Sequence, residues 1–201
     1  MGYLIVILSA YLLGSSSMAF YLSKLAKQDF RSNGSGNLGA SNTMVLLGWG
    51  AGILVGIHDI GKGFAAVLLA KWLFPELPYI GAVAGVACVL GHIFPFYLKF
   101  RGGKGLASYI GMMLALDWRV ALAVILLLVI VTLVTDYIAL GTVTVVITSP
   151  IGLGLLGSLI PALILCAATT VMLFKHRDNY KRIRNGTEIG LRNASKGKHR
   201  V

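Results

Sequence analysis

Long apolar stretches separated by short polar segments dominate the chain. A helix needs about 20 apolar residues, at a rise of about 1.5 Å each, to cross the hydrocarbon core of a bilayer. The stretches that meet or approach this length, and are predicted to span, are Tyr3–Leu22, Gly50–Lys71, Tyr79–Leu98, Arg119–Thr135, Ile138–Leu156 and Leu159–Phe174. A further stretch, Leu106–Leu116, is short, so it is interpreted as a weak span or a re-entrant helix. The predicted fold is an all-α, polytopic membrane bundle of about seven transmembrane helices.

Polar segments divide the apolar stretches. The longest follows the first span, from Ser23 to Thr43, and the Pro75–Pro78 segment ends the second span because proline breaks helices. From Lys175 onwards the chain is polar and basic. We expect a single integral membrane domain over residues 1–190 and a basic, disordered cytoplasmic tail over residues 191–201.

Composition and charge agree with a membrane protein. Of the 201 residues, 57% are hydrophobic and 12% are charged, whereas soluble domains carry about 25% charged residues. The net charge is +11, but the basic residues lie between apolar runs without interleaved aromatic residues. We therefore expect no nucleic-acid partner. The basic residues form three clusters, at residues 24–31, at residues 99–104 and in the tail from Lys175. With seven spans, all three clusters share one side, and the positive-inside rule places the N-terminus outside and the C-terminus in the cytoplasm.

The first polar loop contains the sequence NGSGNLGASN, which suits an anion. Gly34 and Gly36 let backbone N–H groups converge on a negative charge. Ser35, Asn37 and Asn42 add side-chain donors. The alternative is a flexible polar linker, but a linker has no need of the bulky neighbours and closely spaced asparagines found here.

A second candidate phosphate loop follows the third span. The sequence FRGGKG leads directly into an apolar helical stretch, and its glycines are Gly102, Gly103 and Gly105. Backbone amides at a helix N-terminus, with Lys104 among glycines, suit a phosphate group. The spacing is not that of a Walker A loop. The alternative is an ordinary basic cytoplasmic turn.

Ionisable residues also occur inside the predicted spans. His58, Asp59 and Lys62 share one helix face in the second span. Charges at membrane depth are costly and are by default functional. The alternative is a structural Asp59–Lys62 pair that fixes helix packing, and both interpretations can hold together. His92, near the cytoplasmic end of the third span, is either an interface residue or a catalytic one.

The start of the basic tail carries a third group of polar residues. His176, Arg177, Asn179, Arg182 and Glu188 lie within thirteen positions. Basic residues after a last span often only anchor the protein to anionic headgroups. Asn179 and Glu188 are not needed for anchoring, so this segment is predicted to belong to a site.

Together these segments supply many hydrogen-bond donors and few carboxylates on one predicted face. Ser, Asn, Lys, His and Arg side chains stabilise phosphoryl charge by hydrogen bonds and ion pairing. The sequence has no G-x-S-x-G elbow, no metal-ligand cluster and no H-x-x-x-x-D acyltransferase pattern. The simplest common ligand is a phosphate-bearing anion.

The set of motifs resembles the bacterial acyl-phosphate:glycerol-3-phosphate acyltransferase family. The motifs are Gly34-Ser35-Gly36-Asn37-Leu38-Gly39-Ala40-Ser41-Asn42, Asp59-x-x-Lys62-Gly63, Gly91-His92-x-Phe94-Pro95 with Gly102-Gly103-Lys104-Gly105, and His176-Arg177-x-Asn179-x-x-Arg182 with Gly186-x-Glu188. They span about residues 1–188 in the family's order. Each motif is weak alone, but the set is specific.

The resemblance implies a seven-helix protein of the bacterial plasma membrane with its active site facing the cytoplasm. It implies that an acyl group passes from acyl phosphate to the sn-1 hydroxyl of glycerol 3-phosphate, giving lysophosphatidic acid and phosphate in phospholipid biosynthesis. No metal or cofactor is implied. The implied partners are the two substrates, the lipid bilayer and the soluble enzyme that makes acyl phosphate.

The resemblance also assigns candidate roles to residues. The candidate catalytic residues are Ser35, His92, Lys104 and His176. The candidate phosphate-binding residues are Gly34, Gly36, Asn37, Asn42, Gly102, Gly103, Gly105, Thr142, Arg177 and Asn179. The candidate supporting residues are Asp59, Lys62, Arg182 and Glu188.

The chain departs from the family pattern at a few positions. Val45 stands where the family usually carries an arginine, so a cation on a substrate phosphate is missing there. Ser41 and Leu106 replace the usual threonine and valine, and Thr142 keeps a hydroxyl where serine is usual. Val45 leaves open an altered substrate preference.

Two questions of mechanism and function remain open at this stage. The incoming hydroxyl must lose a proton, and the preferred hypothesis gives that proton to the departing phosphate of the donor, with His92 and His176 as the alternative bases. The alternative functions are a membrane transporter or binder of a small organic phosphate, which also needs a cationic site in the membrane, and a non-catalytic scaffold.

Overall fold

The computed structural model describes residues 1–192, and these residues form helices and connecting loops without any strand. They fall into two compact units, Met1–Leu116 and the part from Asp117 onwards. The single domain predicted over residues 1–190 stays a prediction. Of the predicted tail, residues 193–201 lie outside the described residues.

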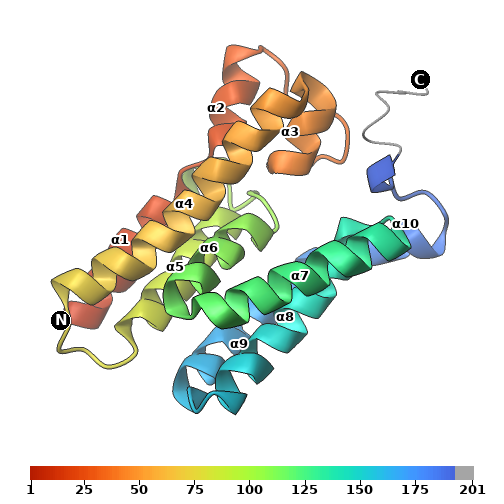
Figure 1. The fold of residues 1–201 in the computed structure, drawn as a ribbon. Coiled ribbons are helices and arrows are strands. Elements are labelled where there is room, and N and C mark those ends of the chain that lie inside the picture. The colour runs from red at the N-terminus through yellow and green to blue at the C-terminus, as the bar shows by residue number, and fades with distance from the viewer. Residues whose placement is uncertain (193–201) are drawn as a thin grey trace. The chain divides into compact units, whose positions relative to one another are not determined.

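The first unit contains the helices before Leu116 (Figure 1). They are α1 (Gly2–Ser15), α2 (Met18–Leu25), α3 (Ala40–Leu47), α4 (Trp49–Leu73), α5 (Ile80–Ile93), the 3₁₀ turn η1 (Phe96–Leu98) and α6 (Leu106–Leu116). Helix α5 packs against α1 and α4, while α4 also packs against α3 and α6. The long helix α4 therefore connects both candidate phosphate loops to the membrane-embedded core.

The second unit is a set of neighbouring helices with one short helix after them. Its helices are α7 (Trp118–Thr135), α8 (Ile138–Leu155), α9 (Leu159–Lys175) and α10 (Arg177–Arg184). Helix α8 packs against both α7 and α9, and the chain bends by 40° between α9 and α10. Asp117 caps α7: its Oδ1 accepts the N–H groups of Arg119 and Val120 at 2.9 and 3.3 Å. The hydrogen-bonded guanidinium of Arg119 holds the pKa of the Asp117 carboxyl below its usual value.

The apolar stretches coincide with helices, as predicted. Among the described residues, five helical segments are long and apolar enough to span a bilayer, or six if α9 and α10 form one bent span. Helix α6 has 11 residues, which at 1.5 Å per residue falls far short of the ~30 Å hydrocarbon thickness. The all-α membrane fold is confirmed, whereas the count of seven spans and the orientation of the termini stay predictions.

The first span differs from its prediction because it is broken. Tyr3–Leu22 was expected as one helix, but α1 ends at Ser15 and α2 begins at Met18, with Ser17 extended between them. A free carbonyl at membrane depth costs several kcal/mol, and the break is stabilised by partners from other elements. Tyr97 Oη donates to the Ser15 carbonyl at 2.8 Å, and Lys62 Nζ donates to the Ser16 carbonyl at 2.7 Å.

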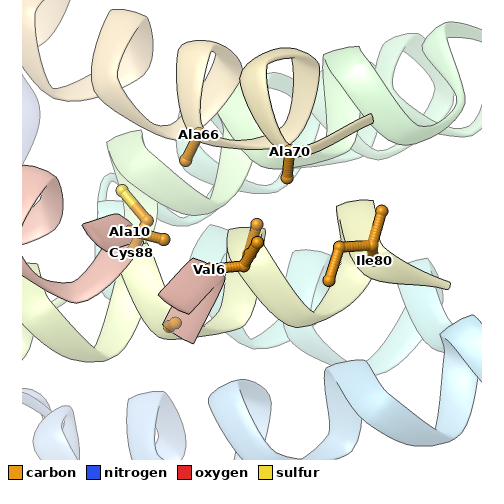
Figure 2. Close-up of a cluster of buried hydrophobic side chains, with 8 residues drawn as sticks. Val6, Ala10, Ala66, Ala70, Ile80 and Cys88 are labelled. Atoms are coloured by element: carbon orange, nitrogen blue, oxygen red, sulfur yellow. The ribbon is translucent and has the colours of Figure 1, made fainter. Parts of the chain in front are cut away.

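Small side chains let the helices of the first unit approach closely. Figure 2 shows one cluster in which Val6 and Ala10 of α1 meet Ala66 and Ala70 of α4 and Ile80 and Cys88 of α5. At Gly14 and Gly91, a Cβ would collide with a backbone carbonyl of the facing helix. Glycine and alanine are the residues that allow such close packing between membrane helices. The unit is thereby held together without long side chains at these contacts.

Candidate functional site

The glycine-rich loop is anchored by apolar residues at both ends. Phe30 and Leu38 are buried in one cluster with Ala19, Val55 and Leu98. The exposed segment between them includes Ser35, and Asn37 is half-buried. A linker does not need buried anchors, so the burial of Phe30 and Leu38 supports the prediction that this loop has a fixed shape.

Two glycines give the loop its sharp turns. Gly34 and Gly36 have φ of 60° and 70°, which non-glycine residues rarely adopt. The space at Gly34 is also closed, because a Cβ there would collide with Asn42 Oδ1. Both positions therefore require glycine for the shape of the loop.

Asn42, the third residue of α3, holds the loop through its buried side chain. Its Oδ1 accepts the N–H of Ser35 at 2.8 Å, and its Nδ2 donates to the carbonyls of Phe30 and Asn33 at 3.0 and 3.3 Å. We call these three hydrogen bonds the Asn42 clamp. All the contacts that define the clamp go to loop backbone, so a direct contact of Asn42 with phosphate stays a prediction.

Asp29 fixes the start of the loop. Its Oδ1 accepts the backbone N–H of Arg31 at 3.0 Å and the Arg31 Nε–H at 3.2 Å, and its own carbonyl accepts from Asn33 Nδ2 at 2.8 Å. The backbone hydrogen bond and the guanidinium hold the pKa of the Asp29 carboxyl below its usual value. Asp29 is thus a local structural residue that the sequence analysis did not single out.

The Lys104 loop, residues 99–105, is attached to the end of α5. The N–H groups of Gly102 and Gly103 donate to the carbonyls of Ile93 and His92, each at 3.1 Å. These carbonyls would otherwise lack partners at a helix C-terminus. Lys104 is half-buried and lies two residues before α6 begins. The predicted position of the lysine among glycines at the N-terminal end of a helix is confirmed.

The two candidate phosphate loops meet at Gly103. A Cβ at Gly103 would collide with the ring of His92 and would lie 2.9 Å from the carbonyl oxygen of Leu38 in the glycine-rich loop. Within the first unit, the structure thus brings together the backbone of both loops and the His92 ring. Sequence reasoning predicted that the loops share a face of the membrane, but not that they touch.

Below these loops lies a buried polar cluster formed by Asp59, Lys62 and His92. Lys62 Nζ lies 2.8 Å from Asp59 Oδ1 and 2.9 Å from His92 Nδ1. All three side chains are at most 6% exposed. His58 joins the rim of the cluster, with Nε2 3.0 Å from Ser16 Oγ and Nδ1 3.3 Å from Asp59 Oδ1. The predicted Asp59–Lys62 pair is present, and His92 joins it from a different helix.

In the second unit, Glu188 connects two of the predicted residues. It accepts from Asn179 Nδ2 at 2.5 Å and from Arg182 Nε at 2.6 Å. Asn179 is buried, and Arg182 and Glu188 are half-buried. The supporting role predicted for Arg182 and Glu188 is thus consistent with a carboxylate that orients Asn179.

His176 is also buried, and its ring orientation is fixed. Its Nδ1 lies 2.8 Å from the Met172 carbonyl, which can only accept, so Nδ1 carries a hydrogen. Tyr180 stacks against the ring with a centroid distance of 6.4 Å. The hydrogen bond to the Met172 carbonyl and the stacking with Tyr180 thus fix the orientation of the His176 ring.

The remaining predicted residues of the second unit have local contacts. Arg177 is exposed and its guanidinium lies over the Phe174 ring at 4.1 Å. Thr142 is buried in α8, where its Oγ1 donates to the Ile138 carbonyl at 3.0 Å. Their predicted roles toward phosphate stay predictions, as do those of His176 and Asn179.

Comparison with known proteins identifies the family. The family model described as glycerol-3-phosphate acyltransferase matches residues 4–186. A glycerol-3-phosphate acyltransferase of Coxiella burnetii is 40% identical over 195 residues, covering 94% of this chain and 97% of that protein. Glycerol-3-phosphate acyltransferase 1 of Oceanobacillus iheyensis is 37% identical over 199 residues, covering 95% and 96%.

Solved structures agree with this assignment. The crystal structure of PlsY (YgiH), an integral membrane glycerol 3-phosphate acyltransferase, in its glycerol 3-phosphate form matches with a TM-score of 0.89 and 32% identity, covering 95% of this chain and 96% of that one. Its lysophosphatidic acid form matches with a TM-score of 0.86 and 32% identity, covering 94% and 95%. The chain is therefore a multi-pass integral membrane protein that belongs to the glycerol-3-phosphate acyltransferase family.

Proposed function

We propose that this protein transfers an acyl group from acyl phosphate to the sn-1 hydroxyl of glycerol 3-phosphate. The observation that carries the proposal is the meeting of two glycine-containing loops at Gly103, with Lys104 next in sequence. Clustered backbone N–H groups and a lysine suit a phosphate. Membership of the family and the two ligand forms of PlsY support glycerol 3-phosphate as acceptor and lysophosphatidic acid as product.

The chemistry needs positioning and charge stabilisation more than a protein nucleophile. The sn-1 oxygen attacks the acyl carbon, the bond between that carbon and the phosphate oxygen breaks, and the phosphate leaves with the hydroxyl proton. Holding both substrates in reacting geometry and stabilising the charge on the leaving phosphate supply the main catalytic effects. Because the N–H groups of Gly102 and Gly103 are bound to the end of α5, the proposed stabilisers of the leaving phosphate are Lys104 and the amide groups in the first turn of α6.

The proposal includes a cytoplasmic site in the bacterial plasma membrane. Glycerol 3-phosphate is charged and water-soluble, whereas the acyl product stays in the bilayer, so a site at the membrane surface serves both. The clusters of lysine and arginine around the two loops favour the cytoplasmic side. The soluble enzyme that makes acyl phosphate is the expected functional partner.

A direct assay tests the proposed function. Purified protein in lipid nanodiscs is given acyl phosphate and labelled glycerol 3-phosphate, and lysophosphatidic acid and phosphate are measured. Stoichiometric formation of both products is expected. The same protein in sealed vesicles is tested for uptake of glycerol 3-phosphate: uptake without product would contradict the proposal and support a transporter.

Replacing His176 with alanine tests where the hydroxyl proton goes. If the departing phosphate takes it, His176→Ala should raise KM for a substrate and leave kcat at saturation largely unchanged. A histidine base would instead contribute about 10²–10⁴-fold to kcat. The measurement is kcat at saturating donor and acceptor, and a collapse of kcat alone would identify His176 as the base.

A further inference from the structure

The buried cluster under the loops determines which nitrogen of His92 carries hydrogen. Lys62 has three N–H donors and no acceptor. Three acceptors surround its Nζ: Asp59 Oδ1 at 2.8 Å, the Ser16 carbonyl at 2.7 Å and His92 Nδ1 at 2.9 Å. The Ser16 carbonyl and the carboxylate can only accept. Each donor of Lys62 therefore has one partner, and His92 Nδ1 must be an acceptor.

The remaining nitrogen of His92 consequently carries the hydrogen. A neutral imidazole with its lone pair on Nδ1 has its hydrogen on Nε2. Protonating both nitrogens would place an Nδ1–H against the Lys62 ammonium at 2.9 Å. Asp59 Oδ1 is a more distant neighbour of Nδ1, at 3.4 Å. The geometry thus favours one tautomer of a neutral ring.

The Nε2 side of this ring meets the Lys104 loop. A Cβ at Gly103 would collide with Nε2 and would lie 2.7 Å from Cε1, and the Gly103 N–H donates to the His92 carbonyl at 3.1 Å. His92 thus contacts this glycine with both its ring and its backbone. The charges that face the ring come from α4, namely Asp59 and Lys62, with His58 beside them.

We propose that the Asp59–Lys62 pair fixes His92 as an Nε2–H donor directed at the Lys104 loop, so that His92 positions this loop and its phosphate and is not the general base. The inference deepens the proposed function, on which it rests. A base needs a lone pair directed at the reacting hydroxyl. Here the lone pair faces Lys62, away from Gly103. His176 differs from His92, because its Nδ1 carries a hydrogen that is bound to a carbonyl.

Nitrogen NMR tests the tautomer without any activity measurement. Protein labelled with ¹⁵N-histidine is placed in nanodiscs, and the His92 signals are assigned by their loss in His92→Gln. The expected result is a one-bond hydrogen coupling on Nε2 and none on Nδ1. Lys62→Met should change this pattern, since Nδ1 loses its donor. A hydrogen on Nδ1 in the unmodified protein would overturn the inference even if acyl transfer is confirmed.

Kinetics of paired variants test the positioning role. The amide nitrogen of glutamine can occupy the place of Nε2, whereas asparagine more closely replaces Nδ1. His92→Gln should therefore keep much of kcat/KM, and His92→Asn should lose about 10- to 100-fold, the value of a hydrogen bond to a charged group, chiefly through KM for acyl phosphate. The pH profile of kcat should keep its shape in His92→Gln.

A matched control separates this role from general packing damage. Val86 is buried on the same helix, α5, and Val86→Ala creates a small cavity there. Only variants that elute as folded protein and keep a cooperative thermal transition are compared. The proposed role is wrong if His92→Asn and Val86→Ala lower kcat/KM by the same factor. It is also wrong if the pH profile of kcat loses an ionisation in His92→Gln. Failure of all variants and of the unmodified protein to form product would instead refute the proposed function.

Discussion

Replacing Lys104 with alanine is expected to lower kcat/KM for acyl transfer by at least about 100-fold, the scale of losing one key electrostatic stabiliser. Lys104 is half-buried in a loop whose neighbouring N–H groups are bound to the end of α5. The loop backbone should therefore keep its shape when the side chain is removed. The loss should come from phosphate binding and leaving-group stabilisation rather than from unfolding.

The matched control for Lys104 is Arg101, which is exposed in the same loop. Arg101→Ala removes one positive charge from the same membrane surface, so it measures the effect of charge alone. We expect little change in kcat/KM for this variant. The comparison uses steady-state kinetics for both substrates in nanodiscs. Equal losses of kcat/KM in the two variants, or unchanged kinetics in folded Lys104→Ala, would contradict the proposed role of Lys104. The basic residues of the loop would then serve only to orient the protein in the membrane.

Replacing Asp59 with alanine is expected to give the largest loss of stability. Lys62 would keep a buried ammonium, 2% exposed, without its carboxylate partner at 2.8 Å. Removing one partner of a buried ion pair costs about 3–5 kcal/mol, because the other charge stays buried and uncompensated. The measurement is the apparent Tm of the variant in lipid nanodiscs against that of the unmodified protein.

A double variant distinguishes the charge from the packing of Asp59. Asp59→Leu with Lys62→Met replaces both ions by apolar side chains, a change that is often neutral or stabilising. We expect the double variant to be more stable than Asp59→Ala, yet to lose activity, because His92 Nδ1 no longer has its donor. An equal loss of apparent Tm in the two variants would show that the pair stabilises the protein through packing rather than through charge.

The sequence predicted helices well wherever length and apolar content decide. Helices α6, α7 and α8 begin and end within one residue of their predicted bounds, and Asp117 marks the start of α7 as a capping residue should. The break in the first span was not predictable in this way. Three consecutive serines, Ser15–Ser17, lie at the break, but the residues that stabilise it, Lys62 and Tyr97, lie far along the chain.

Two short helices were also missed because they lie in polar segments. Helix α3 begins at Ala40, inside the predicted loop, and α10 lies in the predicted basic tail. The end of that segment has tertiary partners too: the N–H groups of Leu191 and Arg192 donate to the carbonyl and the carboxylate of Asp136, at 2.8 and 2.9 Å. Contacts with distant residues, rather than apolar periodicity, stabilise such elements.

The two candidate phosphate loops were predicted from local sequence motifs, and their candidate roles came from the family resemblance. The Asp59–Lys62 pair follows from helical spacing, since i,i+3 residues are neighbours. His92, thirty residues further on, has no local signal that connects it to Lys62. The Asn42 clamp is equally hidden, because an asparagine in a glycine-rich motif suits phosphate contact and loop bracing alike.

The Asn42 clamp has a consequence for how the protein discriminates between the proposed donor and the inorganic phosphate product. Three hydrogen bonds order this loop when the protein folds. The loop therefore loses little further conformational entropy when it binds an anion. If the loop holds the phosphate group of the proposed acyl-phosphate donor, the same readiness extends to inorganic phosphate, which presents similar phosphate oxygen atoms. Preference for the donor must then come from its hydrocarbon chain, whose burial in the bilayer contributes about 0.8 kcal/mol per methylene. In such an enzyme, the bilayer contributes to substrate selectivity as well as the protein.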